Sequence, residues 1–439
     1  MGSDFVYLLK KKRFLPLFLT QFFGAFNDNA FKLAMLTMIS YHLCNSQAQS
    51  ELYQAVAGAL FILPFFAFSA TAGQLADKYD KALMIRLVKV FEVLLMIMGS
   101  FAFYYGNIFF MMVTLTGMGI HSAFFGPIKY AILPDHLPRD DLLRATGLVE
   151  ASTFLAILLG TTLGTLSIGA TNATPVIAIF MTVVVALSGL ISSLFIPNAP
   201  SIAATLKVDF HIGRATIQML KQAKNEQGAF VAILTISWFW LIGAVLLTKL
   251  PDYTHYTLGA NTTVFALFLA LFSIGIALGS LLISRILQGR ITLSVVPWAM
   301  LVFSCFTFDL YWASPVIEVK EPLLALSSFF TYFVHWRISF DLFMLAVSAG
   351  VFVVPLYAYL QVASSPETRA RTIAANNIYN SLFMVLGTVL VMLLLKLNLT
   401  IPHVFLVLSI LNLAAVVSLW ICLWKRKKSA LDEKGDHSL

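Results

Sequence analysis

The sequence predicts an all-α membrane protein with twelve transmembrane helices arranged as two six-helix halves. Three observations lead to this class: a scarcity of charge, a series of long apolar runs, and an alternation of basic and acidic loops. The 439-residue chain is 59% hydrophobic and 11% charged, whereas a soluble domain carries roughly 25% charged residues. So few charges cannot cover a water-facing surface. Most of the chain must therefore lie in lipid, where the backbone has to satisfy its own hydrogen bonds.

The apolar runs have the length of membrane-spanning helices. Residues 231–250, 264–287 and 404–424 are examples, and a helix needs about 20 residues to cross a hydrocarbon layer of ~30 Å. Strands of a membrane barrel would be ~10 residues long and alternate in polarity. The expected spans are residues 14–42, 52–76, 83–104, 107–131, 145–168, 173–196, 228–250, 262–287, 291–314, 339–362, 371–396 and 402–424.

Basic residues gather in every second loop. Because Lys and Arg collect on the cytoplasmic side of a membrane, both termini are predicted to be cytoplasmic, which requires an even number of spans. The net charge of +8 is explained by these loops, and we expect no nucleic acid partner. The basic loops contain Lys10–Arg13, Lys78–Arg86, Arg139 and Arg144, Lys207–Lys224, Arg285 and Arg290, Arg369 and Arg371, and Lys425–Lys428.

A polar stretch after the sixth span divides the chain. It is long enough for a linker and a short amphipathic helix with Ile212, Ile217, Met219 and Leu220 on the cytoplasmic face. An aromatic stretch between the ninth and tenth spans is interpreted as an interfacial segment, because another span would break the parity. The predicted organisation is an N-terminal half at 1–196, a cytoplasmic linker at 197–227, a C-terminal half at 228–428 with an aromatic insertion near 315–337, and a polar cytoplasmic tail at 429–439.

The loop between the second and third spans carries a motif. It reads Gly73-Gln-Leu-Ala-Asp77-Lys78, with Arg86 further on, and Arg285 occupies the corresponding loop of the second half. This pattern resembles the cytoplasmic loop motif of the major facilitator superfamily. We expect Gly73 to allow close helix contact, and Asp77 to cap a facing helix and pair with a cation of the loop. A gate is therefore predicted from five residues: Gly73, Asp77, Lys78, Arg86 and Arg285. The alternative is an ordinary positively charged loop.

Ionisable side chains interrupt three spans of the N-terminal half. Asp28 and Asn29 lie in the first span, Lys129 ends the fourth, and Glu150 opens the fifth. Buried charges are costly in a membrane and are usually functional, so we predict that they line a polar path. The alternatives are a structural hydrogen-bond cluster for Asp28, a snorkelling side chain for Lys129, and an ion pair between Glu150 and Lys129.

The C-terminal half carries fewer ionisable candidates. Lys249 lies near the end of the seventh span, Gln361 in the tenth, and Asn377 and Asn380 on one face of the eleventh. Such amides suit either a polar cavity wall or hydrogen bonds between helices. The outer membrane interface is an alternative explanation for Lys249.

The sequence offers little support for an enzyme. His136 and Asp141 have the H-x4-D spacing of glycerolipid acyltransferases, but they lie in a short loop with no soluble domain around them. Nucleotide-binding and metalloprotease motifs are absent, and the three cysteines match no metal or redox spacing. We therefore expect no catalytic activity, no metal and no cofactor.

Several motifs together resemble the bacterial lysophospholipid transporter family, which belongs to the major facilitator superfamily. The resemblance implies a major facilitator fold and a carrier in the bacterial inner membrane that moves lysophospholipids, chiefly lysophosphatidylethanolamine, to the inner leaflet for re-acylation. It also implies that Asp28, Asn29, Lys129 and Glu150 are transport residues. A family cation aligns near Leu247, two positions before Lys249. The matching motifs include Gln21–Asn29, Gly73–Asp77, Pro127–Tyr130, Gly147–Gly160 and Phe352–Gln361.

The chemistry of such a lipid agrees with the charges of Asp28, Lys129 and Glu150, because its phosphate binds a cation and its amine binds a carboxylate. The expected protein is a monomer with a functional link to a separate acyltransferase. The alternative is a major facilitator carrier of a soluble amphiphile such as a drug or siderophore. A sensor that transports nothing is also compatible with the sequence. A coupling ion, whether proton or sodium, is left open, since buried acids serve both.

Overall fold

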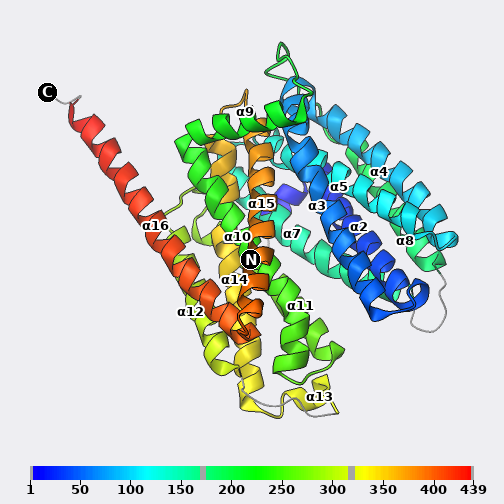
Figure 1. The fold of residues 1–439 in the computed structure, drawn as a ribbon. Coiled ribbons are helices and arrows are strands. Elements are labelled where there is room, and N and C mark those ends of the chain that lie inside the picture. Colours follow the sequence, from blue (N-terminus) through cyan, green and yellow to red (C-terminus); the bar gives the residue numbers. More distant parts are fainter. Residues whose placement is uncertain (1–2, 169–174, 315–321, 437–439) are drawn as a thin grey trace. The chain divides into compact units, whose positions relative to one another are not determined.

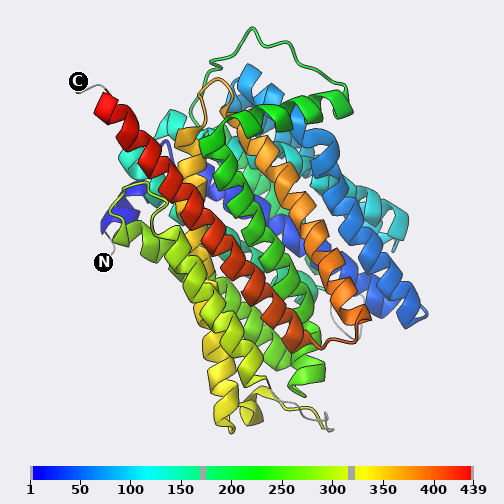
Figure 2. The same cartoon turned by 60° about the vertical axis from the view of Figure 1, so that its left-hand side comes forward.

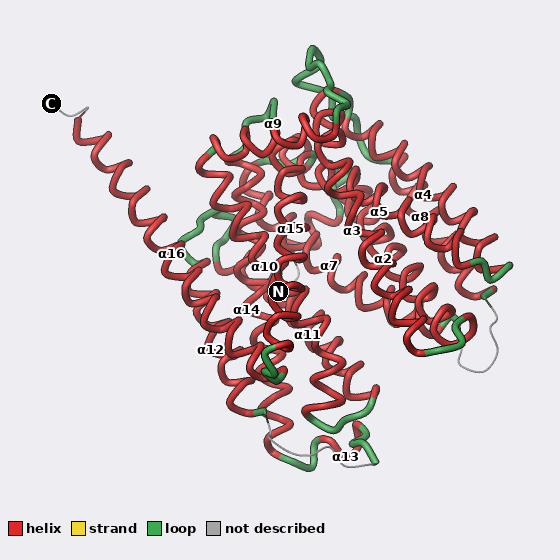
Figure 3. The backbone as a smooth tube through the Cα atoms, viewed as in Figure 1, coloured by secondary structure: helices red, strands yellow, loops and turns green. Residues whose placement is uncertain are grey.

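The computed structural model describes residues 3–168, 175–314 and 322–436. Within these ranges every regular element is a helix, and the one β interaction is an isolated bridge between Ala260 and Leu324 (Figures 1 and 3). The part of the aromatic insertion at 315–321 lies outside the described residues. The all-α class predicted from composition is confirmed.

Twelve helices of at least 18 residues account for most of the described chain. Ten of them are long and apolar enough to cross a membrane, and the other two, α2 and α4, carry ionisable residues in their middle. The twelve are α2 (Leu15–Met38), α3 (Gln47–Lys78), α4 (Lys81–Tyr104), α5 (Ile108–Ala131), α7 (Arg139–Leu166), α8 (Val176–Leu194), α10 (Gln227–Asp252), α11 (Thr262–Ile286), α12 (Val296–Ala313), α14 (Phe333–Ala363), α15 (Arg369–Lys396) and α16 (Ile401–Asp436).

Each expected span coincides with one of these helices, and the differences lie at the ends. Helix α3 begins five residues earlier than hydropathy indicates, because the Ser46 hydroxyl accepts a hydrogen bond from the Gln49 backbone and caps the helix there. Helix α16 continues to Asp436, into the polar tail expected at 429–439. The short elements are α1 (Ser3–Leu9), α6 (Leu133–His136), α9 (Ile212–Asn225), α13 (Leu326–Phe329) and two π-helical turns, Ile39–Leu43 and Tyr253–Thr257.

Two compact units can be distinguished. Unit 1 comprises Met1–Ser237 and Tyr357–Leu382, and unit 2 comprises Trp238–Leu356 and Phe383–Leu439. Unit 1 therefore includes the end of α14 and the first half of α15. The sequence-based halves, 1–196 and 228–428, follow the chain instead and stay a prediction.

The core of unit 1 is formed where α2 packs on α7 and α8, and α5 packs on α3 and α4. Phe31 and Phe103 are fully buried there, with ring centroids 5.1 Å apart. The lipid around the helices is as apolar as these side chains, so the hydrophobic effect does not drive the helices together. Van der Waals contact between closely packed side chains does so instead.

The predicted amphipathic helix is present as α9, which packs against α3. Its buried residues are Ala215, Met219 and Ala223, while Ile212 and Ile217 are exposed. Met219 thus packs inward with two alanines that let α9 lie close to α3, and the placement of the helix at the cytoplasmic face stays a prediction.

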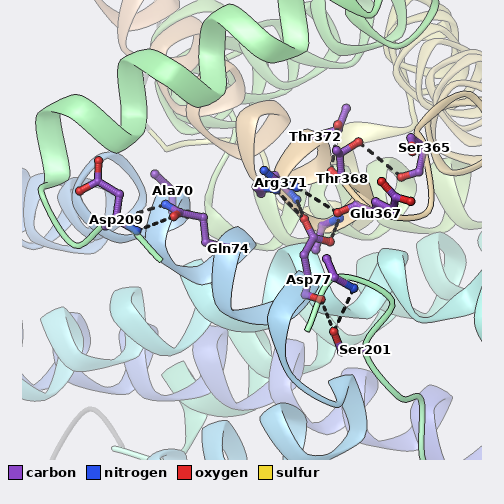
Figure 4. Close-up of polar contacts among 12 residues, drawn as sticks. Ala70, Gln74, Asp77, Ser201, Asp209, Ser365, Glu367, Thr368, Arg371 and Thr372 are labelled. Carbon is purple, nitrogen blue, oxygen red and sulfur yellow. Dashed lines mark hydrogen bonds and ion pairs between the residues drawn. The ribbon is translucent and has the colours of Figure 1, made fainter. Parts of the chain in front are cut away.

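A loop carboxylate anchors the start of α9. The backbone nitrogen of Asp209 donates to Gln74 of α3, 2.7 Å away (Figure 4). The Arg214 side chain donates to the Asp209 carboxylate at 2.6 Å. These hydrogen bonds from Arg214 lower the pKa of Asp209 to about 2.

In unit 2, α12 and α16 lie side by side (Figure 2). The Asn412 amide of α16 joins α10 to α12: it accepts from the Trp238 indole at 2.7 Å and donates to the Ser304 hydroxyl at 2.8 Å. The described part of the aromatic insertion forms α13 and the first turn of α14, and Phe329 stacks on His335 with ring centroids 4.1 Å apart.

Candidate functional site

Asp28, in the middle of α2, is held by neutral groups and remains partly exposed. The Ser122 hydroxyl of α5 donates to its Oδ2 atom at 2.6 Å, and 16% of the side chain is exposed. Its Oδ1 atom accepts no hydrogen bond from a described residue. The neighbouring Asn29 donates to the carbonyl of Ala25 in its own helix. Asp28 thus has one buried carboxylate oxygen without a hydrogen-bond donor among the described residues.

A fully buried ion pair lies next to Asp28. The Lys89 ammonium is 2.6 Å from the Glu92 carboxylate, and both side chains of this α4 pair have no exposed surface. The Asn27 amide donates to Glu92 at 2.9 Å, and Nε2 of His121 lies 3.2 Å from the same carboxylate. Burying two charges is costly unless they are paired and further hydrogen-bonded, and here both conditions are met.

Sequence reasoning missed Lys89, Glu92 and His121. The signal was present, because a Lys and a Glu three residues apart inside a span share one helix face. A small residue also makes room for the pair: a Cβ atom on Gly24 of α2 would lie 2.6 Å from the Lys89 nitrogen. The Lys89 ammonium also lies 5.0 Å from the centre of the Phe125 ring, at cation–π distance.

Glu150 of α7 is buried and is bonded to a tyrosine. The Tyr130 hydroxyl donates to Glu150, and the Tyr130 ring stacks on Tyr357 at 4.5 Å between centroids. Lys129 is half-buried and its ammonium lies 4.7 Å from the centre of the Tyr130 ring. Among the described residues no ion pair joins Lys129 to Glu150, although Lys129 is within electrostatic reach of both Glu150 and Asp28. The Lys129 ammonium is therefore available to an anionic group.

The amides expected in the tenth and eleventh spans make mainly interhelical contacts. Gln361 donates to the Thr146 hydroxyl of α7 at 3.0 Å, and Asn380 accepts from Ser237 of α10 at 2.9 Å. The Asn377 amide nitrogen is buried and has no partner among the described residues. These positions favour helix association over a cavity wall for Gln361 and Asn380.

Lys249 lies in unit 2 at the end of α10, where its ammonium is 2.8 Å from Asp252. This pair is partly exposed and local, as expected of a residue near a membrane interface. Within the described ranges, no group of three or more His, Cys, Asp or Glu side chains is placed to share a metal ion.

Asp77, at the end of α3, caps the beginning of α15 (Figure 4). Its carboxylate accepts from the backbone nitrogens of Ala370 and Arg371 at 2.9 and 3.2 Å, and from the Arg371 side chain at 2.9 Å. The sequence suggested a cap on a facing helix with a cation from the Asp77 loop. The cation comes instead from α15, because only that helix presents both its free N–H groups and a guanidinium to the buried carboxylate.

Gly73 allows this contact to form. A Cβ atom at Gly73 would lie 2.7 Å from the Cβ of Ala374 and 2.9 Å from the Cα of Arg371. Both distances are too short for contacts between two carbon atoms. The helices α3 and α15 can therefore meet only where α3 has no side chain.

The loop cations have other partners. Lys78 lies over the Tyr79 ring, 5.7 Å from its centre, and Arg86 donates to the carbonyl of Ile196 at 2.8 Å. Arg285 is exposed in the last turn of α11 in unit 2. A second link between helix ends is made by Asp135, which is 2.9 Å from Lys81 and 3.2 Å from Arg369.

The residues of the H-x4-D spacing lie apart from the polar cluster. His136 ends α6, and Asp141, in the first turn of α7, pairs with Lys11 at 2.6 Å.

Long apolar helices that bury ionisable groups define a multi-pass membrane protein of the transporter class. Residues 17–340 match the family model of the major facilitator superfamily, and the chain belongs to that superfamily. The predicted resemblance to lysophospholipid transporters is confirmed. The protein of that name from Citrobacter koseri is 26% identical over 95% of this chain and 96% of its own length. The one from Serratia proteamaculans is 29% identical over 86% of this chain and 87% of its own length.

Solved structures of the superfamily share the fold. The human organic anion transporter MFSD10 aligns with a TM-score of 0.69 at 14% identity, covering 92% of this chain and 98% of that chain. FucP in its outward conformation aligns with a TM-score of 0.71 at 12% identity, covering 94% and 98%. The predicted major facilitator fold is thereby confirmed.

Proposed function

We propose that this protein is a secondary transporter that moves lysophospholipids, chiefly lysophosphatidylethanolamine, from the outer to the inner leaflet of the bacterial inner membrane. The carrying observation is that relatives named lysophospholipid transporters align along nearly the whole chain, while unit 1 holds charges of both signs within its helices. The lipid is then re-acylated by a separate acyltransferase, and the carrier works as a monomer with both termini cytoplasmic.

The headgroup chemistry assigns a role to two of these charges. The phosphate of a lysophospholipid accepts charge-assisted hydrogen bonds and its amine donates them. Lys129 supplies the cation, since it is half-buried and has no carboxylate partner among the described residues. Asp28 supplies the carboxylate, since 16% of its side chain is exposed and its buried Oδ1 atom accepts no hydrogen bond from a described residue. Glu150 acts indirectly, by holding Tyr130 beside Lys129.

The acyl chain needs no polar path. Many large apolar side chains of the long helices are exposed, including Phe101, Leu163 and Phe180, as expected of surfaces that face lipid. A single acyl chain can remain in such surroundings while only the headgroup crosses. The function therefore requires a small polar site in the helices and no cofactor.

Transport by the purified full-length chain tests the proposal. In reconstituted vesicles that contain labelled lysophosphatidylethanolamine, we expect Lys129→Gln and Asp28→Asn to reduce the transfer rate at least about tenfold, since each removes a charge-assisted bond of roughly 1.5–3 kcal/mol. Lys396→Gln is the matched control, because Lys396 is exposed at the end of α15. Transfer that is unchanged in both site variants would show that these residues do not carry the headgroup.

A carrier of a soluble amphiphile would behave differently. Such a carrier would give no protein-dependent transfer of the lipid, and lysophosphatidylethanolamine would not compete with its substrate. Transfer that depends on the protein and is competed by unlabelled lysophospholipid supports the proposal. Its absence would favour the soluble substrate.

A further inference from the structure

His121 of α5 lies between two carboxylates in unit 1. Its Nε2 atom is 3.2 Å from Glu92 and its Nδ1 atom is 3.9 Å from Oδ1 of Asp28, while only 1% of its side chain is exposed. A neutral imidazole has one N–H and can offer it to one of these groups, whereas an imidazolium offers one to each. In the neutral ring, one nitrogen lone pair would face a carboxylate oxygen, which is repulsive.

Among the ion pairs of this cluster, the charges balance when His121 carries a proton. Lys89 offsets Glu92, with which it forms the buried pair at 2.6 Å. Asp28 accepts a hydrogen bond from the neutral Ser122 hydroxyl, and among the described residues its one ion-pair partner within 4 Å is His121. A bound proton on His121 therefore completes the neutralisation of a buried cluster, which is favourable in a low-dielectric environment.

The other groups on the packed helices do not replace this proton. On α2, Asn27 donates to Glu92, and Lys32 is within electrostatic reach of Asp28 while its ammonium lies 5.4 Å from the centre of the Phe61 ring of α3. On α8, Gly189 contributes no side chain beside Lys89. Lys129, further along α5, is within electrostatic reach of Asp28 but lies against Tyr130. His121 is thus the titratable group that faces Asp28 most directly.

We propose that His121 is a proton-binding site that competes with the lipid ammonium for the Asp28 carboxylate, so that loading an amine-bearing lysophospholipid releases one proton. This inference rests on the proposed function. In the exchange, the N–H bond at Nδ1 breaks and the proton passes to water, while Nε2 keeps its proton toward Glu92. The ammonium then takes the place of the imidazolium as the cation opposite Asp28, and the total charge of the site is unchanged.

The competition has a direct consequence for energetics. Because one proton is exchanged for one headgroup, acid on the side where the lipid loads weakens loading. An inward proton gradient therefore opposes inward movement of the lipid. The flux must then be driven by a reaction that consumes the lysophospholipid in the inner leaflet, and acylation of its free hydroxyl is a reaction of that class.

Proton release on binding tests the inference. The full-length chain in nanodiscs is mixed with lysophosphatidylethanolamine in weakly buffered solution, and released protons are counted with a pH-sensitive dye between pH 5.5 and 8, the range in which imidazoles change charge. We expect about one proton per lipid at the acidic end, and an apparent Kd that rises by up to about tenfold per pH unit of acidification. Lysophosphatidylglycerol, which lacks the amine, should release none.

Two variants make the test specific. His121→Gln should bind lysophosphatidylethanolamine with no proton release and no pH dependence, whereas His403→Gln, a control at the partly exposed start of α16 in unit 2, should behave like the wild type. Asp28→Asn is a second variant that keeps the Ser122 bond. It should bind more weakly and without pH dependence, so the test does not depend on one variant folding.

The outcomes separate the two proposals. Binding of lysophosphatidylethanolamine by the wild type without proton release, or proton release that persists in His121→Gln, would overturn the role of His121 and leave the proposed function intact. A release that follows sodium concentration instead of pH would also overturn it. Failure of the wild type to bind both lipids would remove the proposed function and this inference together.

Discussion

Asp77 and Arg371 are joined twice: the backbone nitrogen and the Nε atom of Arg371 both donate to Oδ2 of Asp77, at 3.2 and 2.9 Å. The contact is at once a helix cap and an ion pair, and the Asp77 side chain is only 1% exposed. A contact of this kind can form in one conformation of a transporter and break in another. It then stabilises the conformation in which it is formed.

Removing the charge of Asp77 should loosen the start of α15. Asp77→Asn keeps a carbonyl acceptor but loses charge-assisted bonding, at a cost of about 2 kcal/mol. We expect amide hydrogen exchange of residues 369–375 to accelerate by at least about tenfold. Asp209→Asn is the control, since Asp209 pairs with Arg214 outside this contact. Equal exchange in wild type and Asp77→Asn would exclude a holding role for the cap.

A side chain at Gly73 should separate α3 from α15. Gly73→Val would place atoms within 2.9 Å of the Arg371 backbone, and such overpacking typically costs 1–3 kcal/mol, so transport should fall by about tenfold or more. Gly58→Val is matched in residue type and helix, and a Cβ there meets nothing within 4 Å. Transport rates in vesicles compare the two variants. A similar loss in both would point to helix propensity as the cause.

Breaking the buried pair of α4 should destabilise the protein strongly. Glu92→Gln leaves the Lys89 ammonium buried without its counter-ion, a change that usually costs 3–5 kcal/mol. Thermal unfolding in detergent measures the effect, and the double variant Lys89→Met with Glu92→Leu should recover much of the loss. Asp309→Asn disrupts the partly exposed pair with Arg337 and should cost less than about 1 kcal/mol. A small effect of Glu92→Gln would mean that water reaches the pair.

Removing the Tyr130 hydroxyl should affect both stability and transport. Tyr130→Phe leaves the carboxylate of Glu150, which is 1% exposed, without its donor, and an unsatisfied buried acceptor costs about 1–3 kcal/mol. Glu150→Gln should be milder because its amide oxygen can still accept from Tyr130. Tyr105→Phe, at a side chain that is 74% exposed, is the control. Melting temperature and lipid transfer report the two effects.

The membrane-spanning helices could be located from the sequence because each of them has to be compatible with lipid on its own. A helix in hydrocarbon must be apolar along its own length, so the information is local. The ends were less accurate because caps such as Ser46 lie in polar loops, where hydropathy carries no signal. The residues of α9 that pack on α3 could not be found from hydropathy either, because the buried Ala215 is less apolar than the exposed Ile217.

The candidate site was predicted only in part. Asp28 and Glu150 stood out as single acids in apolar runs, but the residues that complete their surroundings did not. His121 is an ordinary polar residue in the sequence and becomes notable only between Glu92 and Asp28.

The sequence by itself determined that most of this protein is surrounded by lipid. It also determined the number and approximate positions of the long helices, and the superfamily to which the chain belongs. These properties depend on composition within short windows and on motifs that can be compared directly. The tertiary structure decided which charges meet. Asp77 and Arg371 are 294 positions apart, and the carboxylates beside His121 come from two other helices, so their pairing follows from helix packing and cannot be found within any one segment.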